Sequence, residues 1–366
     1  MTRNRKTLLL FLDVDWHNPQ TGGELVNAEV IQFALKYETN VDLFTGEHLP
    51  RIVRQQKVLS RICINIICAF FCIFRRYDLI VTDQYLHSKI VLASIIARIR
   101  GTKQVAIVYH LTYSLRKNRM LRWAEKMTEC TLLSSANLII TLSESAEREV
   151  QDLGISGQKI RRIIPPVNSL GEREEFVRPV HHGGLKLLFV GTCYERKGIK
   201  YLLEALSLLN EEVDTLHIVG KYEEQDIYYI ELQSIIAQHH LGNRVYFHGR
   251  ISDSDLKQFY RSADVFVLPS LWEGFGFVLQ EAMIVGLPII ATNVGSIPEL
   301  IVDNENGILV PARDSNALAQ AISYLYAHPE QRIALGQVGY NKILAADSQG
   351  SFAQQLFDLA NSLYEK

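Results

Sequence analysis

Residues 269–287 read PSLWEGFGFVLQEAMIVGL and follow directly on the short apolar segment 265–268. The apolar segment predicts a buried strand, the glycines and aromatics that follow predict a turn, and the apolar run behind them predicts a helix. Glu273 precedes this helix, and Glu281 lies eight positions further on, a separation of roughly 12 Å along a helix. Two carboxylates this far apart cannot share a proton, but they can hold the two ends of one extended ligand.

The turn between the two glutamates suits a phosphorylated ligand. Gly274, Phe275 and Gly276 bring the backbone close to whatever binds there, and a helix N-terminus offers free N–H groups and a partial positive charge. A nucleotide sugar meets these demands. The alternative is an ordinary strand, loop and helix with two solvated glutamates, because two glutamates at this spacing recur by chance.

Composition indicates a soluble globular chain with two domains. The 366 residues are enough for two cores, and 48% of them are hydrophobic. The five cysteines form no C-x-x-C pair, so the sequence predicts no disulfide framework and no zinc site. The apolar run in MTRNRKTLLLFLDVDWHN is too short for a signal peptide and ends in aspartates. It predicts a first buried strand and a cytoplasmic location.

Charge divides the chain into two unlike halves. Residues 1–168 contain 23 Lys and Arg against 15 Asp and Glu, a net charge of +8, whereas the remainder has a net charge of −10. A basic half indicates an anionic partner. Since no basic run is interleaved with aromatics, we expect no nucleic acid and favour peripheral contact with an anionic membrane, on its inner face.

Apolar and amphipathic segments alternate through the first half, which predicts a doubly wound Rossmann-like domain over residues 1–168. No G-x-G-x-x-G fingerprint follows the first strand. Gly22 and Gly23 open a helix there, and His110 ends a strand, the place where a doubly wound sheet carries its site residues. Both features are also compatible with plain structural roles. The expected strands are 8–14, 40–45, 78–82, 104–110, 137–142 and 160–164, and the expected helices are 24–36, 50–76, 89–100, 115–134 and a short one after Ser143.

The segment 58–76, VLSRICINIICAFFCIFRR, is apolar on almost every face from Ile62 to Phe74. It is too short to span a bilayer. We interpret it as a helix buried between the sheet and its neighbours. The alternative is an interfacial membrane helix with arginines at the headgroups, which the basic residues of 116–126 support.

Residues 163–184 are rich in proline, glycine and charge and predict an interdomain linker. The alternation then begins again, which predicts a second Rossmann-like domain over residues 169–349. Arg196 and Lys197 lie just before Gly198 opens a helix, and two cations beside free N–H groups make a diphosphate site. The expected strands are 185–190, 215–219, 245–247, 265–268, 287–291 and 307–310, and the expected helices are 198–209, 226–239, 252–262, one behind 276, a short one at 298, and 315–327.

Taken together, these motifs resemble the retaining GT-B glycosyltransferases of family 4, or group 1, along nearly the whole chain. The similarity is carried by TGGELVNAEVIQFAL, His110, IIPPVN, FVGTCYERKGIKYLLEAL, YRSADVFVLPSLWEGFGFVLQEAMIVGLPIIATNVGSIPELI and NGILVP. It implies two Rossmann-like domains with a deep cleft between them. It also implies that the C-terminal segment 350–366, an amphipathic helix, packs back on the first domain.

The resemblance assigns a role to each candidate residue. Glu281 would hold the ribose, and Glu273 with the backbone of Gly274, Phe275 and Gly276 would contact the donor sugar. Arg196 and Lys197 would neutralise the diphosphate, and His110 would reach the sugar from the first domain. The remaining contacts would be made by Gly249, Arg250 and Ile251 to the base and by Gly22 and Gly23 near the donor phosphate and acceptor. Many members carry arginine where this chain has Thr192, and one branch places it before the lysine, as here.

The implied reaction moves a sugar from a nucleoside-diphosphate sugar to a glycan or lipid-linked acceptor. Helix dipoles and cations would stabilise the leaving diphosphate without a metal or other cofactor, in keeping with the lack of a D-x-D motif in the predicted site loops. Two other functions remain open at this point. One is a non-catalytic glycan-binding relative, and the other is a nicotinamide-dependent oxidoreductase with two Rossmann domains, against which the missing fingerprint argues.

Overall fold

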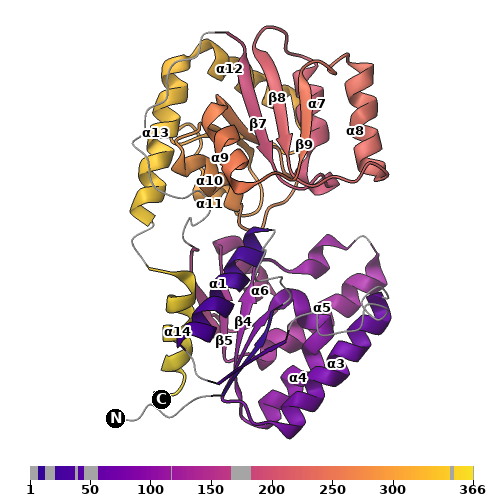
Figure 1. The fold of residues 1–366 in the computed structure, drawn as a ribbon, viewed down its shortest axis with the longest axis vertical. Helices are drawn as coiled ribbons and strands as arrows, with labels where there is room; N and C mark the ends of the chain where they lie inside the picture. Colours follow the sequence, from indigo (N-terminus) through magenta and orange to yellow (C-terminus); the bar gives the residue numbers. More distant parts are fainter. Residues whose placement is uncertain are drawn as a thin grey trace. The chain divides into compact units, whose positions relative to one another are not determined.

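The computed structural model describes residues 7–12, 21–37, 40–44, 57–116, 118–165, 183–346 and 350–365. The chain forms two compact units, one of Met1–Pro165 with Gly350–Lys366 and one of Pro166–Gln349. Each unit has its own six-stranded parallel sheet with helices packed on it (Figure 1). The α/β fold class predicted from the alternating segments is confirmed.

The first sheet has the strand order β2-β1-β3-β4-β5-β6. Because crossovers between parallel strands are right-handed, the change of direction between β1 and β3 puts α1 on one face and α3, α4 and α5 on the other, as Figure 1 shows. The strands are Leu8–Phe11, Val41–Phe44, Leu79–Asp83, Lys103–Val108, Leu138–Thr141 and Ile160–Arg162 for β1 to β6. The helices are α1 Gly22–Tyr37, α3 Lys57–Phe74, α4 His87–Ile99, α5 Arg119–Ser135, α6 Glu144–Asp152 and α14 Phe352–Ser362.

Helix α14 packs beside α1, although more than 300 residues separate them in sequence. The ring of Phe357 stacks on Phe33 with centroids 5.3 Å apart. The backbone N–H of Ala353 donates to Glu29 Oε1 over 3.1 Å. The end of the chain is therefore part of the first unit.

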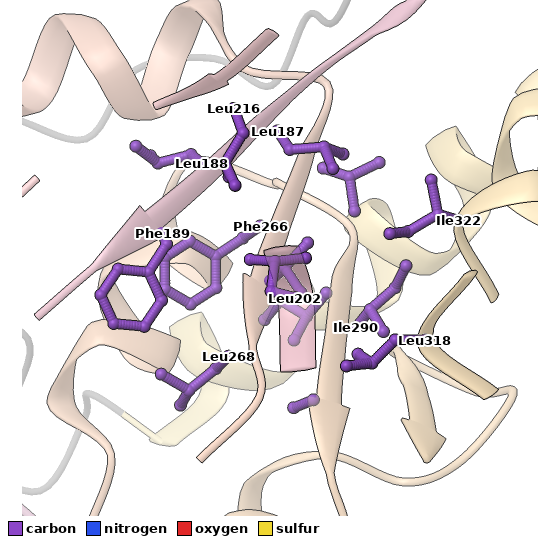
Figure 2. Close-up of a cluster of buried hydrophobic side chains, with 14 of the residues drawn as sticks. Leu187, Leu188, Phe189, Leu202, Leu216, Phe266, Leu268, Ile290, Leu318 and Ile322 are labelled. Atoms are coloured by element: carbon purple, nitrogen blue, oxygen red, sulfur yellow. The ribbon is translucent and has the colours of Figure 1, made fainter. Parts of the chain in front are cut away.

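The second sheet has the order β12-β11-β10-β7-β8-β9, with its change of direction between β7 and β10. Strand β10 is buried throughout and β7 at every position but Lys186, as expected when helices cover both faces of a sheet. Figure 2 shows their side chains packed with Leu202, Leu318 and Ile322 of the covering helices. The strands are β7 Leu185–Val190, β8 Val213–Val219, β9 Val245–Gly249, β10 Val265–Leu268, β11 Ile289–Thr292 and β12 Ile308–Val310. The helices are α7 Ile199–Leu206, α8 Ile227–Gln238, α9 Asp253–Ser262, α10 Phe277–Ile284, α11 Ile297–Leu300, α12 Ser315–Ala327 and α13 Pro329–Ala346.

Three predicted helix starts coincide with N-caps. The side chains of Ser143, Asp226 and Ser252 each accept a hydrogen bond from a backbone N–H of the first turn, at 3.1, 2.8 and 3.2 Å. Such a bond satisfies one of the donors that a helix N-terminus leaves unpaired.

The region around His110 differs from the prediction. Strand β4 ends at Val108, so His110 lies two residues beyond the strand. The helix expected over 115–134 begins only at Arg119, where the Asn118 side chain accepts from the N–H groups of Met120 and Leu121. A 3₁₀ turn, η3 Thr112–Leu115, takes the place of its first residues.

Helix α3 is only half buried, so the prediction of a helix buried on all sides is wrong for its outer face. Ile64, Cys68 and Cys72 are buried, but Phe70 and Phe74 are exposed over 58% and 72% of their surface. No helix in the described part of the chain is long and apolar enough to cross a bilayer. Three predicted features fall outside the described residues: the end of the first strand at 13–14, the helix start at 50–56 and most of the linker, 166–182.

Candidate functional site

The second sheet changes direction between β7 and β10, and ligands of doubly wound sheets bind beyond the carboxyl ends of the strands at such a point. The loop after β7 carries the 3₁₀ turn η5, Glu195–Lys197. The loop after β10 carries Glu273. The topology therefore brings together the two loops that the sequence singled out.

Lys197 and Glu273 form a buried ion pair at this point. Lys197 Nζ donates to Glu273 Oε2 over 2.7 Å, and the two residues expose only 7% and 8% of their surface. Ser270 Oγ donates to the same oxygen over 3.2 Å, and Arg196 Nη1 lies 3.9 Å from it. Burial acts to raise the pKa of Glu273, but Lys197 and Arg196 outweigh burial and hold that pKa below its ordinary value. Glu273 is therefore ionised at neutral pH and is not poised to donate a proton.

Arg196 presents an unsatisfied donor beside this pair. Its Nη1 is buried and has no hydrogen-bond partner among the described residues. The Arg196 carbonyl accepts from the Leu271 N–H over 2.7 Å, which ties the two loops together. A buried guanidinium nitrogen without a partner is costly, and an anionic oxygen would satisfy it.

Two glycines allow the loops to approach this closely. Gly198 and Gly295 have φ angles of +67° and +54°, and a Cβ there would lie 1.9 Å from Pro269 O and 2.1 Å from Glu273 O. The Glu273 carbonyl accepts from the Ser296 N–H over 3.1 Å. The backbone of Glu273 is thus held from two sides.

The N-terminus of α10 comes directly after the loop that carries Glu273. Gly276 is its N-cap residue with φ +81°, and no side chain described here caps this end of the helix. The Leu279 N–H donates to the Gly276 carbonyl over 2.9 Å, and the helix dipole places a partial positive charge at this end that attracts an anion. Phe275 is buried against Phe277, with ring centroids 4.7 Å apart, which fixes the turn.

Glu281 lies in the second turn of α10. Its Oε2 accepts from the Tyr260 hydroxyl over 2.7 Å. Tyr260 is completely buried, and burial with the neighbouring carboxylate raises its pKa well above the ordinary value, so the hydroxyl remains a donor. Tyr260 thereby fixes one oxygen of Glu281 and orients the carboxylate.

Gly249 ends the edge strand β9 and Arg250 and Ile251 follow it, at the carboxyl edge of the same sheet. Gly249 has φ +64°, and its carbonyl accepts from the Gly220 N–H over 2.8 Å. Tyr222, which stacks on Tyr229 at 4.6 Å, stands close to Gly249. This aromatic pair was not predicted, and it adds a flat apolar surface next to the segment.

In the first unit, His110 belongs to a polar network at the carboxyl edge of the sheet. Its Nδ1 is 2.9 Å from the Tyr85 hydroxyl. Asp83, the last residue of β3, accepts from the Tyr85 N–H over 2.7 Å and from Asn27 Nδ2 over 2.6 Å. Asn27 lies on α1, so this chain of contacts connects the helix opened by the two glycines to the histidine.

The Tyr109 side chain holds Gly23 in place. The Tyr109 hydroxyl is within hydrogen-bonding distance of the Gly23 carbonyl, at 3.0 Å, and of Asn27 Oδ1, at 2.9 Å. A Cβ at Gly23 would be 3.4 Å from the Tyr109 ring. The structure therefore gathers Gly22, Gly23 and His110 at one edge of the first sheet.

A buried glutamate, Glu129, and a half-buried one, Glu149, hold the segment that follows His110. Glu149 Oε2 accepts from the Leu111 N–H over 2.8 Å, and Glu129 Oε1 accepts from the Thr112 N–H over 2.7 Å. Burial raises the pKa of both carboxyl groups, and the hydrogen bonds they accept offset part of the rise. The loop that presents His110 is thus fixed by side chains of α5 and α6.

Sequence reasoning missed several of these residues. Asp83 had a detectable signal, because it is a polar residue that ends an apolar strand. Asn27, Tyr260 and Glu129 had none, since each sits inside a helix at a position that looks like any other. Within the described ranges, no three His, Cys, Asp or Glu side chains are grouped so that they could hold a metal ion.

Comparison with known proteins places this geometry in a family. Residues 172–342 match the model described as glycosyl transferases group 1. The chain is 29% identical over 245 residues to an uncharacterized 41.2 kDa protein in the cps region of Klebsiella pneumoniae, covering 64% of this chain and 65% of that protein. It is 31% identical over 200 residues to the amylovoran biosynthesis glycosyltransferase AmsK of Erwinia amylovora, covering 51% and 47%. The chain spans about half to two thirds of the length of these curated relatives.

Solved structures share the fold over almost the full chain. The sucrose-phosphate synthase of Thermosynechococcus elongatus aligns with a TM-score of 0.79 at 23% identity, covering 98% of this chain and 100% of that one. Anabaena HepE in complex with UDP-glucose aligns with a TM-score of 0.73 at 20% identity, covering 97% and 99%. Residues 172–342 therefore match the group 1 glycosyl transferases, and the chain has the GT-B fold of these solved structures over almost its full length.

Proposed function

We propose that this chain is a retaining glycosyltransferase of family 4 that moves a hexosyl group from a nucleoside-diphosphate sugar to a glycan or lipid-linked acceptor. We place it in cell-surface polysaccharide or glycolipid synthesis, in the cytoplasm at the inner face of a membrane. The observation that carries the proposal is the buried Lys197–Glu273 pair at the β7–β10 switch point, beside the uncapped mouth of α10. The AmsK relative and the UDP-glucose complex of HepE support it.

The donor site is built from the second unit. Glu281, oriented by Tyr260, holds the ribose hydroxyls, and the backbone of Gly249, Arg250 and Ile251 holds the base. Arg196 and Lys197 neutralise the diphosphate, and Arg196 Nη1 gains the acceptor it lacks. Glu273 with the backbone of Gly274, Phe275 and Gly276 contacts the sugar. These roles follow the geometry and the family resemblance together.

The reaction breaks the bond between the sugar C1 and the diphosphate oxygen and forms a bond from C1 to an acceptor hydroxyl oxygen on the same face. The acceptor proton passes to the leaving diphosphate, which acts as the base. The two cations and the α10 dipole stabilise the negative charge that develops on the diphosphate, and the Glu273 carboxylate stabilises the positive charge on the sugar. No metal or cofactor is required in this scheme.

The first unit supplies the acceptor side. By the family resemblance alone, we assign His110 to the donor sugar and Gly22 and Gly23 to the donor phosphate and acceptor. The Tyr85 hydroxyl fixes the His110 ring through the contact to Nδ1.

Calorimetry and a donor-cleavage assay test the proposal. UDP, GDP and ADP are titrated first, and the matching sugar nucleotides are then screened for release of the nucleoside diphosphate. We expect Glu281→Ala to weaken nucleotide binding by roughly tenfold or more, because it removes a charge-assisted hydrogen bond. Glu273→Ala should bind the nucleotide normally and mainly lose turnover.

Two outcomes contradict these assignments. Unchanged nucleotide affinity in Glu281→Ala removes the ribose role. Tight nucleotide binding with no turnover of any sugar nucleotide, with or without added acceptors, makes the chain a non-catalytic relative.

A further inference from the structure

Helices α3, α4 and α5 form one layer on the first sheet. Their crossovers all run in the same direction along the sheet, from β2 to β3, β4 and β5, so right-handed connections place them on the same face. Helix α4 packs against α3 on one side and α5 on the other. The inner surface of the layer is ordinary core, including Cys68, Ala93 and Leu132.

The outer surface of this layer is also apolar. Nearly half of all large apolar side chains that the structure describes as exposed lie on these three helices. We call the surface formed by Ile66, Phe70, Phe74, Ile99, Met120 and Trp123 the apolar face; its members expose between 58% and 80% of their surface. Exposed large apolar side chains gathered on neighbouring helices are typical of an interaction site.

The charged side chains around the apolar face are mostly basic. Helices α3, α4 and α5 contain seven Lys and Arg but only two Asp and Glu. Glu129 is completely buried, and Glu125 is bound by Arg116 at 2.7 Å on two atoms. Exposed cations such as Arg119, Arg122 and Lys126 therefore stand among the apolar side chains without an exposed carboxylate from the layer to balance them.

A groove runs between α4 and α5. It has a volume of about 540 Å³ and is lined by Ile95, Ile99, Met127 and Cys130. Arg98 lies at the same groove, where its guanidinium donates to the Ser134 carbonyl over 3.0 Å. An apolar groove beside a guanidinium suits an acyl chain attached to a phosphate.

We propose that the apolar face rests on an anionic phospholipid bilayer, with its aromatic and aliphatic side chains at the level of the headgroups and its cations on the lipid phosphates. Exposed tryptophan and phenylalanine flanked by arginine and lysine are typical of helices that lie in a membrane interface. An anionic leaflet presents phosphates to every cation of this face wherever it lies, whereas a protein partner would need an acidic side chain opposite each of them. The inference adds to the proposed function the surface that would bring the enzyme to a lipid-linked acceptor. The membrane contact itself does not depend on the proposed function; only the link to an acceptor rests on it.

Flotation with vesicles tests the docking. The full chain is mixed with vesicles of phosphatidylcholine alone, or with phosphatidylglycerol added, at low and high salt. We expect flotation with the anionic vesicles only, weakened by salt. Phe74→Ser/Trp123→Ser should abolish it, and Arg119→Glu/Arg122→Glu should weaken it by about fivefold or more for each cation removed.

Matched variants in the second unit serve as controls. Ile227→Ser removes a side chain that is 84% exposed on α8, and Lys257→Glu reverses a charge on α9; both should float like the unmodified chain. All variants are first checked by thermal unfolding and by nucleotide binding, which none of these positions should alter. Retained nucleotide binding with lost flotation separates this proposal from the proposed function.

Three results overturn the inference. The first is no flotation with anionic vesicles at low salt. The second is equal loss in the face variants and in the α8 control. The third is a dimer of the free chain that Phe74→Ser/Trp123→Ser dissociates, because the face would then be occupied by a second copy.

Discussion

At the scale of single residues, Lys197 and Glu273 depend on each other. The carboxylate is buried and ionised because the ammonium 2.7 Å away and the more distant Arg196 hold its pKa down against burial. Removal of one partner of a buried pair leaves the other charge uncompensated, which typically costs more than the pair contributes.

The first prediction follows from this pair. Lys197→Met should lower the free energy of unfolding by roughly 3 to 5 kcal/mol, and Glu273→Gln added to it should recover part of that loss. Denaturant unfolding of the two single variants and the double variant measures the coupling. Losses that simply add would show that the two side chains do not interact in the folded chain.

Position 295 requires glycine both for its positive φ angle and for the lack of space around it. Ala at Gly295 would place a Cβ 2.1 Å from the Glu273 carbonyl in addition to adopting a positive φ. We predict that Gly295→Ala lowers both stability and turnover of the donor. Gly101→Ala is the matched control, because Gly101 has φ +76° but nothing within 4 Å, so only the backbone strain of about 1–2 kcal/mol remains. Equal effects of the two substitutions on turnover would show that the close approach of Gly295 to the Glu273 carbonyl does not matter for activity.

At the scale of elements, strands β8 and β9 place two histidines against each other. His217 Nδ1 lies 2.9 Å from His248 Nε2, and Phe259 packs on both rings. Burial lowers the pKa of both imidazoles, and His248 with Lys186 lowers that of His217 further. The folded chain therefore takes up protons here at a lower pH than the unfolded chain.

The third prediction is a loss of stability on the acid side of neutrality. As the pH falls through the ordinary histidine value of 6.5, the unfolded chain binds protons that the folded chain does not, so unfolding becomes easier. His217→Gln/His248→Gln should flatten the dependence of the unfolding midpoint on pH between about 7 and 5. An unaltered slope in the double variant would rule out the pair as its source.

Element boundaries also show what the sequence could and could not predict. The buried strands and the capped helices were predictable because apolar runs and capping side chains are local signals. Helix α13 was not predicted, since Gly336 and Gly339 lower the helix propensity of its sequence. The structure explains Gly336: a Cβ there would lie 2.2 Å from the Gly286 carbonyl, so this glycine lets α13 approach the segment that follows α10.

Part of the candidate site was also predictable from the sequence. Glu273, Lys197, Arg196 and Glu281 lie near strand ends or helix starts, where the pattern of the chain marks them. The direct contact between Lys197 and Glu273 was not predictable, because it depends on β7 and β10 being neighbours in the sheet. The exposed outer side of α3 was missed for a related reason: an apolar sequence does not say how many of its faces are covered.

At the scale of the whole molecule, the two units differ in how the chain builds them. Residues 183–346 lie within the second unit as one uninterrupted stretch, whereas the first unit uses residues from both ends of the sequence. Phe357 is buried against Phe33 and belongs to the first unit.

The fourth prediction uses this division. Phe357→Ala should destabilise the first unit by roughly 3 to 5 kcal/mol, as expected for a buried phenylalanine, and leave the second unit unchanged. Hydrogen exchange resolved by peptide should show faster exchange in α1 and its sheet but not around β7 and β10. Gln354→Ala, on the exposed side of α14, should change neither unit. Faster exchange throughout the chain in Phe357→Ala would mean that the two units unfold together.

The position of α14 also fixes an order of events during protein synthesis. Residues 350–365 leave the ribosome only after the whole of 183–346 has been made, and domains fold as units as they emerge. The second unit can therefore reach its native state while the first still lacks a helix and exposes the α1 surface that α14 later covers. Over that interval the first unit relies on its own partial stability, and the synthesis of α14 completes it.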